Sequence, residues 1–231
     1  MLSVLDIFRI GIGPSSSHTV GPMRIARRFV RALGKSGALD KVARVTVELQ
    51  GSLALTGIGH GTVDASILGL AGFAPDRTDP DEAAEALRRI EVDKCLSLGG
   101  QRRIGFDRAR DIDLAGHIIP VLHPNGMVLR GFEGAGRLFM EETYYSVGGG
   151  FVVTDTELEA IKHELHKIGV NINQIAFAAN TRKIKLAKGE MHALDDLRLV
   201  MPRVRTFLQA VVAEQRRRGV RLFKAFVEAE A

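Results

Sequence analysis

Residues 11–23 read Gly-Ile-Gly-Pro-Ser-Ser-Ser-His-Thr-Val-Gly-Pro-Met, a run of small hydroxyl side chains framed by glycine and proline. The glycines and proline interrupt regular structure before Ser15, and the apolar residues that follow recur at helical spacing. These apolar residues are Val20, Met23, Ala26, Phe29, Val30 and Leu33. The serines and His18 are therefore predicted to lie at a helix N-terminus, where free backbone N–H groups and the helix dipole favour a carboxylate or phosphate. An ordinary capped turn is the alternative interpretation.

A second glycine-rich loop, Gly57-Ile-Gly-His-Gly-Thr62, follows a predicted strand in which Val45, Val47 and Leu49 alternate with polar residues. The glycines allow close backbone approach, so His60 would face whatever binds there and could act as an acid or a base near neutral pH. The spacing fits neither the Rossmann fingerprint nor the P-loop, so nucleotide binding is not indicated. A phosphate loop or a plain turn is the alternative.

Helix and strand patterns are mixed in the first two thirds of the chain. Helices are predicted over residues 63–70 and 80–90, the second after an Asp-Pro start signal. Several strands follow, among them the two arms of a hairpin at residues 128–132 and 138–145. These patterns indicate an α+β domain over residues 1–153, with helices packed on a mixed sheet.

From Thr154 onward the sequence pattern is helical only. An apolar stripe that we expect to end at Gly169 consists of Leu158, Ile161, Leu165 and Ile168. Two further helices are predicted over residues 178–199 and 202–226. Residues 154–231 are therefore predicted to form a helical tail.

The composition excludes several classes of protein. The chain has 231 residues, of which 45% are hydrophobic and 26% charged, as in ordinary globular proteins. No run of 18 apolar residues is present, so we expect no membrane span, and the N-terminal stretch lacks the basic start of a secretory signal. Cys95 is the only cysteine, which excludes an internal disulfide and fits a reducing cytoplasm. One thiolate is also too few to hold a zinc ribbon or an iron–sulfur cluster.

The positive charge is concentrated in the tail. Residues 182–224 hold twelve Lys and Arg against four Asp and Glu, whereas the whole chain has a formal net charge of only +5. The chain has no Trp and two Tyr, so stacking platforms for single-stranded nucleic acid are not indicated. A solvated or partner-facing helix is therefore preferred to a nucleic-acid-binding surface.

Four segments together resemble the β domain of the iron–sulfur L-serine dehydratases, also called L-serine ammonia-lyases. They are residues 12–23, residues 51–62, His-Pro-Asn-Gly at 123–126, and Glu-Thr-Tyr-Tyr-Ser-Val-Gly-Gly-Gly-Phe at 142–151. The resemblance covers about residues 3–153, in one order and at consistent spacing. It implies a fold similar to the serine-binding regulatory domain of some phosphoglycerate dehydrogenases.

The resemblance also implies a chemistry. L-serine would be converted to pyruvate and ammonia without pyridoxal phosphate, with a 4Fe–4S cluster as Lewis acid. On the matching positions His60 would be the catalytic acid or base, with Thr62 hydrogen-bonding beside it. The residues expected to hold the charges of the substrate are Ser15, Ser16, Ser17, His18 and Thr19.

The cluster cysteines of this family lie in a catalytic α part, and Cys95 alone cannot replace them. The sequence therefore predicts that this chain is either the N-terminal portion or one subunit of a larger enzyme, inactive by itself. We expect a cytoplasmic homodimer that binds L-serine and a cluster-bearing α domain or subunit, with no nucleic acid and no membrane as partner. A serine-binding regulatory module without chemistry of its own is the alternative.

Overall fold

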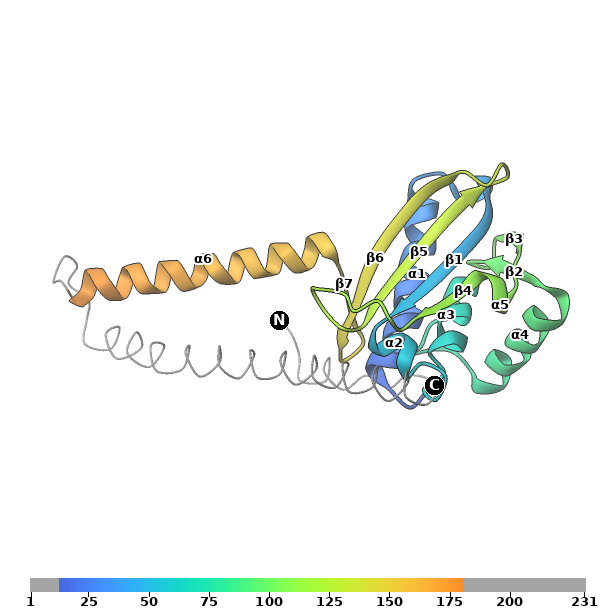
Figure 1. Ribbon diagram of the computed structural model, residues 1–231, viewed down its shortest axis with the longest axis horizontal. Helices are drawn as coiled ribbons and strands as arrows, with labels where there is room; N and C mark the ends of the chain where they lie inside the picture. Colours follow the sequence, from blue (N-terminus) through green and yellow to red (C-terminus); the bar gives the residue numbers. More distant parts are fainter. Residues whose placement is uncertain (1–12, 181–231) are drawn as a thin grey trace. The chain divides into compact units, whose positions relative to one another are not determined.

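The computed structural model describes residues 13–180, and its N-terminal region is built on a five-stranded mixed sheet (Figure 1). The strand order is β4-β1-β5-β6-β7. The bounds are β1 Val42–Gln50, β4 Ile112–Ala115, β5 Gly126–Glu133, β6 Leu138–Gly148 and β7 Phe151–Thr154. The β1–β4 pair is parallel and the other pairs are antiparallel. The predicted α+β class and the predicted hairpin are thereby confirmed.

The sheet carries a core on the face covered by α1 (Gly21–Lys35) and α3 (Thr62–Ala71). The side chains of Val45, Val47 and Leu49 on β1 are completely buried, as their alternation predicted. The predicted apolar face of α1 is buried too, with Phe29 and Leu33 fully inaccessible. Apolar side chains recur every two residues in the strand and about every 3.6 residues in the helix, and their burial positions the helix against the sheet.

The two helices approach each other closely because a glycine lies at their contact. A Cβ atom at Gly69 of α3 would lie 2.8 Å from the Ala26 Cβ and even closer to the Met23 carbonyl of α1. α3 ends at Gly72, whose φ of 99° is the left-handed conformation typical of a helix C-terminus. Because α1 and α3 each follow one of the two glycine-rich motifs, their close packing brings both motifs to the same end of the fold.

Shorter elements complete the N-terminal region. Their bounds are the π-helical turn η2 Ser16–Val20, the 3-10 turn η3 Leu39–Lys41, α2 Ser52–Leu55, α4 Pro80–Asp93, β2 Cys95–Leu98, β3 Arg102–Gly105 and α5 Arg108–Asp111. Asp79 caps α4 as predicted, since its carboxylate accepts hydrogen bonds from the backbone of Asp81 and Glu82. The antiparallel β2–β3 hairpin was not predicted because each arm has only four residues, too few to establish a period.

α6 spans Asp155–Asn180, so the predicted end of this helix at Gly169 is wrong. A glycine inside a helix costs about 1 kcal/mol relative to alanine, but it keeps its backbone donor and acceptor, and the helix continues. The helix predicted over residues 202–226, most of the one predicted over 178–199, and the basic segment 182–224 lie outside the described residues.

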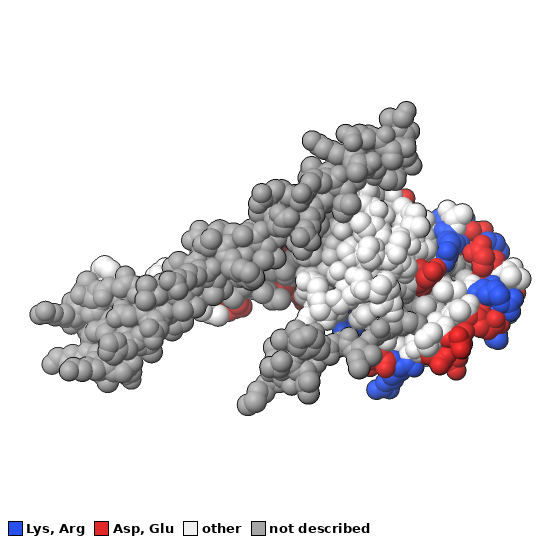
Figure 2. All heavy atoms as spheres, turned by 90° about the horizontal axis from the view of Figure 1, so that it is seen from below, with Lys and Arg blue, Asp and Glu red and all other residues white. Residues whose placement is uncertain are grey.

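The surface where α4 lies carries acidic and basic side chains interspersed, as Figure 2 shows. On α4 itself Glu85 pairs with Arg88 and Arg89 at 2.8 and 2.7 Å. Such a mixture differs from the single-sign patch of a nucleic-acid-binding surface. Among the described residues, no helix combines the length and the apolar character needed to cross a bilayer.

Gly21 gives a test of the packing at the start of α1. A Cβ atom there would overlap the Ser146 hydroxyl and lie 2.8 Å from the Ser146 Cβ on β6. Gly21→Ala should therefore lower the free energy of unfolding by about 1–3 kcal/mol in urea titrations. Gly34→Ala in the same helix is the control, because its Cβ would meet no atom within 4 Å, and it should stabilise by about 0.4–1 kcal/mol. Equal effects of the two substitutions would contradict this packing.

Candidate functional site

The serine turn before α1 is held by its own hydroxyl groups. Ser15 precedes η2, and its Oγ accepts a hydrogen bond from the His18 backbone N–H at 3.2 Å. The Ser17 Oγ lies 2.9 Å from Nδ1 of His18. Ser16 is exposed. Two of the three predicted serines thus shape the turn and orient its imidazole, and the third faces solvent.

His18 lies between two hydroxyl groups. Its Nε2 is 3.0 Å from the Ser52 Oγ, the first residue of α2. Burial is the main cause that lowers the pKa of His18, the nearby His60 lowers it further, and a hydrogen bond to Ser52 opposes both. His18 is therefore a neutral imidazole at neutral pH, fixed at both ring nitrogens.

His60 lies directly beside this ring, with 5.2 Å between the ring centroids and 39° between the ring planes. Its Nδ1 is 2.8 Å from the carbonyl oxygen of Thr56. Because a carbonyl can only accept, Nδ1 carries the hydrogen, and Nε2 keeps a lone pair that can take a proton. The hydrogen bond to Thr56 therefore fixes His60 in the tautomer that a general base at Nε2 requires.

A side chain of the serine turn ties the two motifs together. The Thr19 Oγ1 donates a hydrogen bond of 2.9 Å to the His60 carbonyl, across 41 residues of sequence. Thr19 is only 6% exposed, so this contact is shielded from water. The structure thus brings together the predicted residues of both motifs at the N-terminal ends of α1 and α3.

Thr62 is completely buried as the first residue of α3. Its backbone N–H donates to the Gly57 carbonyl at 2.9 Å, closing the loop that carries His60. Its hydroxyl is the one buried side-chain polar atom without a hydrogen-bond partner among the described residues. A buried hydroxyl left without a partner costs about 1–3 kcal/mol, so this atom is a candidate for a ligand contact.

Sequence reasoning missed the residues that anchor the serine turn to the sheet. Ser146 is fully buried on β6, and its Oγ donates to the Ser17 carbonyl at 2.8 Å. Asn125 in turn donates through Nδ2 to the Ser146 carbonyl at 3.0 Å. Both residues lie inside segments that the sequence singled out, but only their buried positions, Ser146 on β6 and Asn125 just before β5, show that these polar side chains serve the site.

His123 lies in the same loop as Asn125, next to the first turn of α2. The Pro124 carbonyl accepts a hydrogen bond from the Ser52 backbone at 3.0 Å, and the His123 ring meets the Tyr145 ring edge-on at 6.5 Å. Burial lowers the pKa of His123 to about 4. Its Nδ1 accepts a hydrogen bond from the Asn125 backbone N–H at 3.2 Å, which only an unprotonated nitrogen can do.

No group of three or more His, Cys, Asp or Glu side chains lies close enough to hold a metal ion within residues 13–180. Cys95, the single cysteine, begins β2 and is partly buried. An iron–sulfur cluster needs several thiolate ligands, so the residues present here do not fit one.

Comparison with known proteins agrees with this arrangement of motifs. A family model described as "Serine dehydratase beta chain" matches residues 3–157. This chain belongs to that family. The match includes every residue of the two motifs, 11–23 and 57–62. The resemblance drawn from the sequence is thereby confirmed at the level of the family.

Three curated relatives are longer proteins, and this chain matches only part of each. The chain is 47% identical over 154 residues to an L-serine dehydratase of Mycobacterium bovis, 48% over 161 residues to one of Streptomyces coelicolor, and 44% over 156 residues to L-serine dehydratase 1 of Escherichia coli. These matches cover 67%, 69% and 67% of this chain but 33%, 35% and 34% of the relatives. The chain therefore spans about a third of the length of the curated relatives it matches.

The partly buried imidazole of His123 predicts that the stability of the fold depends on pH. Its pKa in the folded chain, about 4, lies below the ordinary value of 6.5, so between these values the unfolded chain takes up a proton that the folded chain does not. The free energy of unfolding should fall as the pH falls from about 6.5 to 4, by at most about 3 kcal/mol from this residue.

His123→Asn is the matched variant, because an asparagine oxygen can accept the same backbone hydrogen bond without titrating. Urea unfolding at several pH values should show a shallower slope for this variant than for the wild type. The remaining slope comes from His18 and other groups. Identical slopes in the two proteins would show that His123 is not buried in its neutral form.

Proposed function

We propose that this chain is the part of an L-serine dehydratase that binds L-serine and removes its Cα proton. The reaction would convert L-serine to pyruvate and ammonia without pyridoxal phosphate. The observation that carries the proposal is Nε2 of His60, which makes no hydrogen bond within residues 13–180 and lies beside a neutral His18 and the hydroxyl groups of a helix N-terminus. The curated relatives named L-serine dehydratase support the same assignment.

His60 would act as the general base. The Cα proton of serine is only weakly acidic, so its removal requires a base that is already oriented. When Nε2 of His60 takes the proton, the new positive charge would lie beside His18, 5.2 Å away. The lowered pKa of His18 keeps that ring neutral, which avoids placing two like charges together.

The hydroxyl groups of the serine turn would hold the substrate in two different ways. The exposed Ser16 and the N-terminal end of η2 can meet the substrate carboxylate directly. Ser15, Ser17 and Thr19 would instead hold the turn and His18, since their hydroxyls already make the hydrogen bonds described above. Thr62, whose buried hydroxyl has no partner among the described residues, is proposed to bind a polar group of the substrate.

The rest of the active site would come from polypeptide outside this chain. The 4Fe–4S cluster implied by the resemblance does not fit the residues of this chain, so we place its ligands on a catalytic α domain or subunit. Large apolar side chains are exposed near the histidines, Ile58 at 80% and Val121 at 87%. Ile58 lies two residues from His60, and Val121 lies two residues from His123. The segment before Val121 is held next to α2, because the Ile118 carbonyl accepts a hydrogen bond of 2.8 Å from the Gly51 backbone N–H.

Exposed apolar side chains beside a polar site are typical of a surface that another domain covers. We therefore propose that the catalytic α part docks on this rim, the exposed apolar surface formed by Ile58 and Val121, and closes the substrate site. A cytoplasmic location and a homodimeric complete enzyme belong to the same proposal. A serine-binding regulatory module without chemistry would use the same pocket, but it would not need His60 as a base.

Activity of the His60→Ala variant separates the two functions. In the complete enzyme, assembled with its α part under anaerobic conditions, this variant should form pyruvate from L-serine about 10²–10⁴ times more slowly, because a general base is lost. His163→Ala on the exposed surface of α6 is the control and should keep full activity. Serine binding with unchanged turnover in His60→Ala would favour the regulatory module.

The chain by itself should form no pyruvate from L-serine after anaerobic reconstitution with iron and sulfide, and robust turnover would refute the divided active site.

Ile58→Asp and Val121→Asp should each weaken binding of the α part, measured by calorimetry or co-purification. A charge buried in the interface without a partner costs affinity. Val92→Asp on α4 is the matched control, because Val92 is also exposed, at 70%, but does not border the site. Equal losses in all three variants would contradict docking on this rim.

A further inference from the structure

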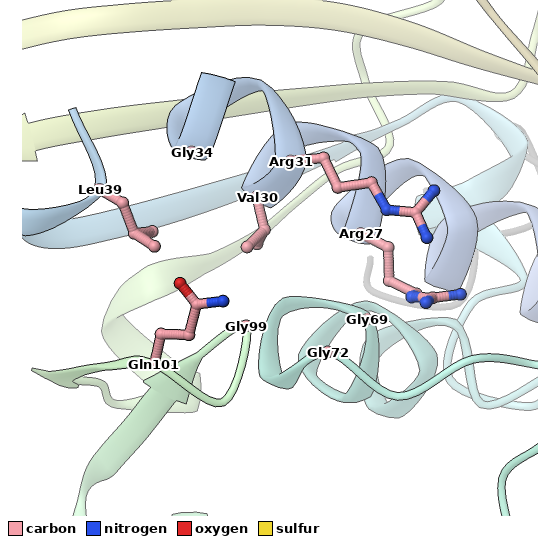
Figure 3. A pocket seen from close by; sticks show the side chains of 9 residues that line it. All are labelled: Arg27, Val30, Arg31, Gly34, Leu39, Gly69, Gly72, Gly99 and Gln101. Atoms are coloured by element: carbon pink, nitrogen blue, oxygen red, sulfur yellow. The ribbon is translucent and has the colours of Figure 1, made fainter. Parts of the chain in front are cut away.

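A groove of about 250 Å³ lies beside the C-terminal half of α1 (Figure 3). One wall consists of α1 with Arg27, Arg31 and Gly34, and the other of the end of α3 and the β2–β3 turn. None of its lining residues belongs to the histidine site. The volume is just below the range of sites for drug-sized ligands, so a small metabolite would fit.

Two arginines dominate the chemistry of this groove. Arg27 and Arg31 are one helical turn apart, and Figure 3 shows their side chains leaving the same face of α1 and extending in the same direction. Neither guanidinium makes a hydrogen bond or an ion pair with any residue of the part that the structure describes. Burial is the first cause that lowers the pKa of Arg27, and the charge of Arg31 is the second.

One carboxylate, that of Asp76, acts on this pair without neutralising it. Asp76 attracts Arg27, but the charge of Arg77 opposes that attraction. Asp76 also lies 3.9 Å from the Nε of Arg77, so its charge is shared. The group of three arginines and one aspartate keeps an excess of two positive charges. Unpaired guanidinium groups that repel each other are a favourable arrangement for an added anion.

The opposite wall is made of backbone rather than side chains. A Cβ atom at Gly99 would lie 2.8 Å from the Val30 Cγ1, and one at Gly72 would lie 3.2 Å from the Gly99 carbonyl carbon. At Gly34, in contrast, a Cβ atom would meet nothing within 4 Å, so the groove is open there. Gln101 extends from the β2–β3 turn toward Leu39 and Val30, on the side of the groove away from the two guanidinium groups.

We propose that this groove binds a small dianionic oxyanion, the phosphate of a monoester or the carboxylates of a short dicarboxylic acid. The planar guanidinium groups of Arg27 and Arg31 would each donate to oxygen atoms of the ligand. The site is separate from the histidine pair, so it does not depend on the proposed function.

Calorimetric titration of the full chain with inorganic phosphate and with succinate tests the proposal, at neutral pH and with ionic strength held constant by chloride. At least one of the two should bind saturably. Arg27→Gln and Arg31→Gln should each weaken binding about tenfold or more, because each removes a charge-assisted contact. Arg103→Gln is the matched control, since Arg103 is an exposed arginine of β3 that does not line the groove.

A second test of anion binding fills the groove with a larger side chain and leaves both arginines in place. Gly34→Leu adds side-chain atoms at the open wall and should also weaken binding, whereas Gly134→Leu, at another open position, should not. His60→Ala should bind the anion as the wild type does, so failure here and failure of the proposed function are distinguishable. Saturable binding of phosphate alone or of succinate alone identifies the ligand class. Absence of saturable binding, or equal losses in Arg103→Gln and the groove variants, would overturn the proposal.

Discussion

The hydrogen bond from Thr19 to the carbonyl of His60 is the contact on which the site depends. Each of the two loops that it joins is rich in glycine and lies outside the strands of the sheet. A glycine-rich loop loses much conformational entropy when it is ordered, so its position must be held by specific contacts. A hydrogen bond between the loops, donated by the buried Thr19, serves this purpose, and it places one imidazole against the other.

Two further long-range contacts complete this anchorage. Ser146 on β6 holds the serine turn through the Ser17 carbonyl, and Ser52 on α2 holds the ring of His18. The turn is thus fixed to the sheet, to α2 and to the loop of His60. Glycines make these approaches sterically feasible: Gly21 leaves space for the Ser146 hydroxyl, and Gly69 lets α3 lie against α1. The same packing that stabilises the fold therefore also sets the geometry of the two histidines.

Much of this arrangement could be predicted from the sequence, because its determinants are local. The apolar face of α1 and the alternation in β1 follow from periodicity, and the glycine and proline of residues 11–23 mark the turn. The division of labour among the three serines could not be predicted, since it depends on which hydroxyl meets His18 in space. Ser146 was missed for the same reason: its partner is 129 residues away.

The two errors in secondary structure have equally physical causes. The β2–β3 hairpin is too short to show a period, although its residues Leu96, Leu98 and Ile104 are buried. Gly169 was given too much weight as a stop signal, because one glycine lowers helix stability without removing a hydrogen bond. Neither error affected the site, which lies at the N-terminal ends of α1 and α3.

Nuclear magnetic resonance of the histidine side chains tests most directly whether the two motifs form one site. The rings of His18 and His60 should show mutual nuclear Overhauser contacts, and His60 should be the tautomer protonated at Nδ1. Folded protein without any contact between these rings would contradict the account, because His60 would then lie apart from the hydroxyl groups that are proposed to hold its substrate.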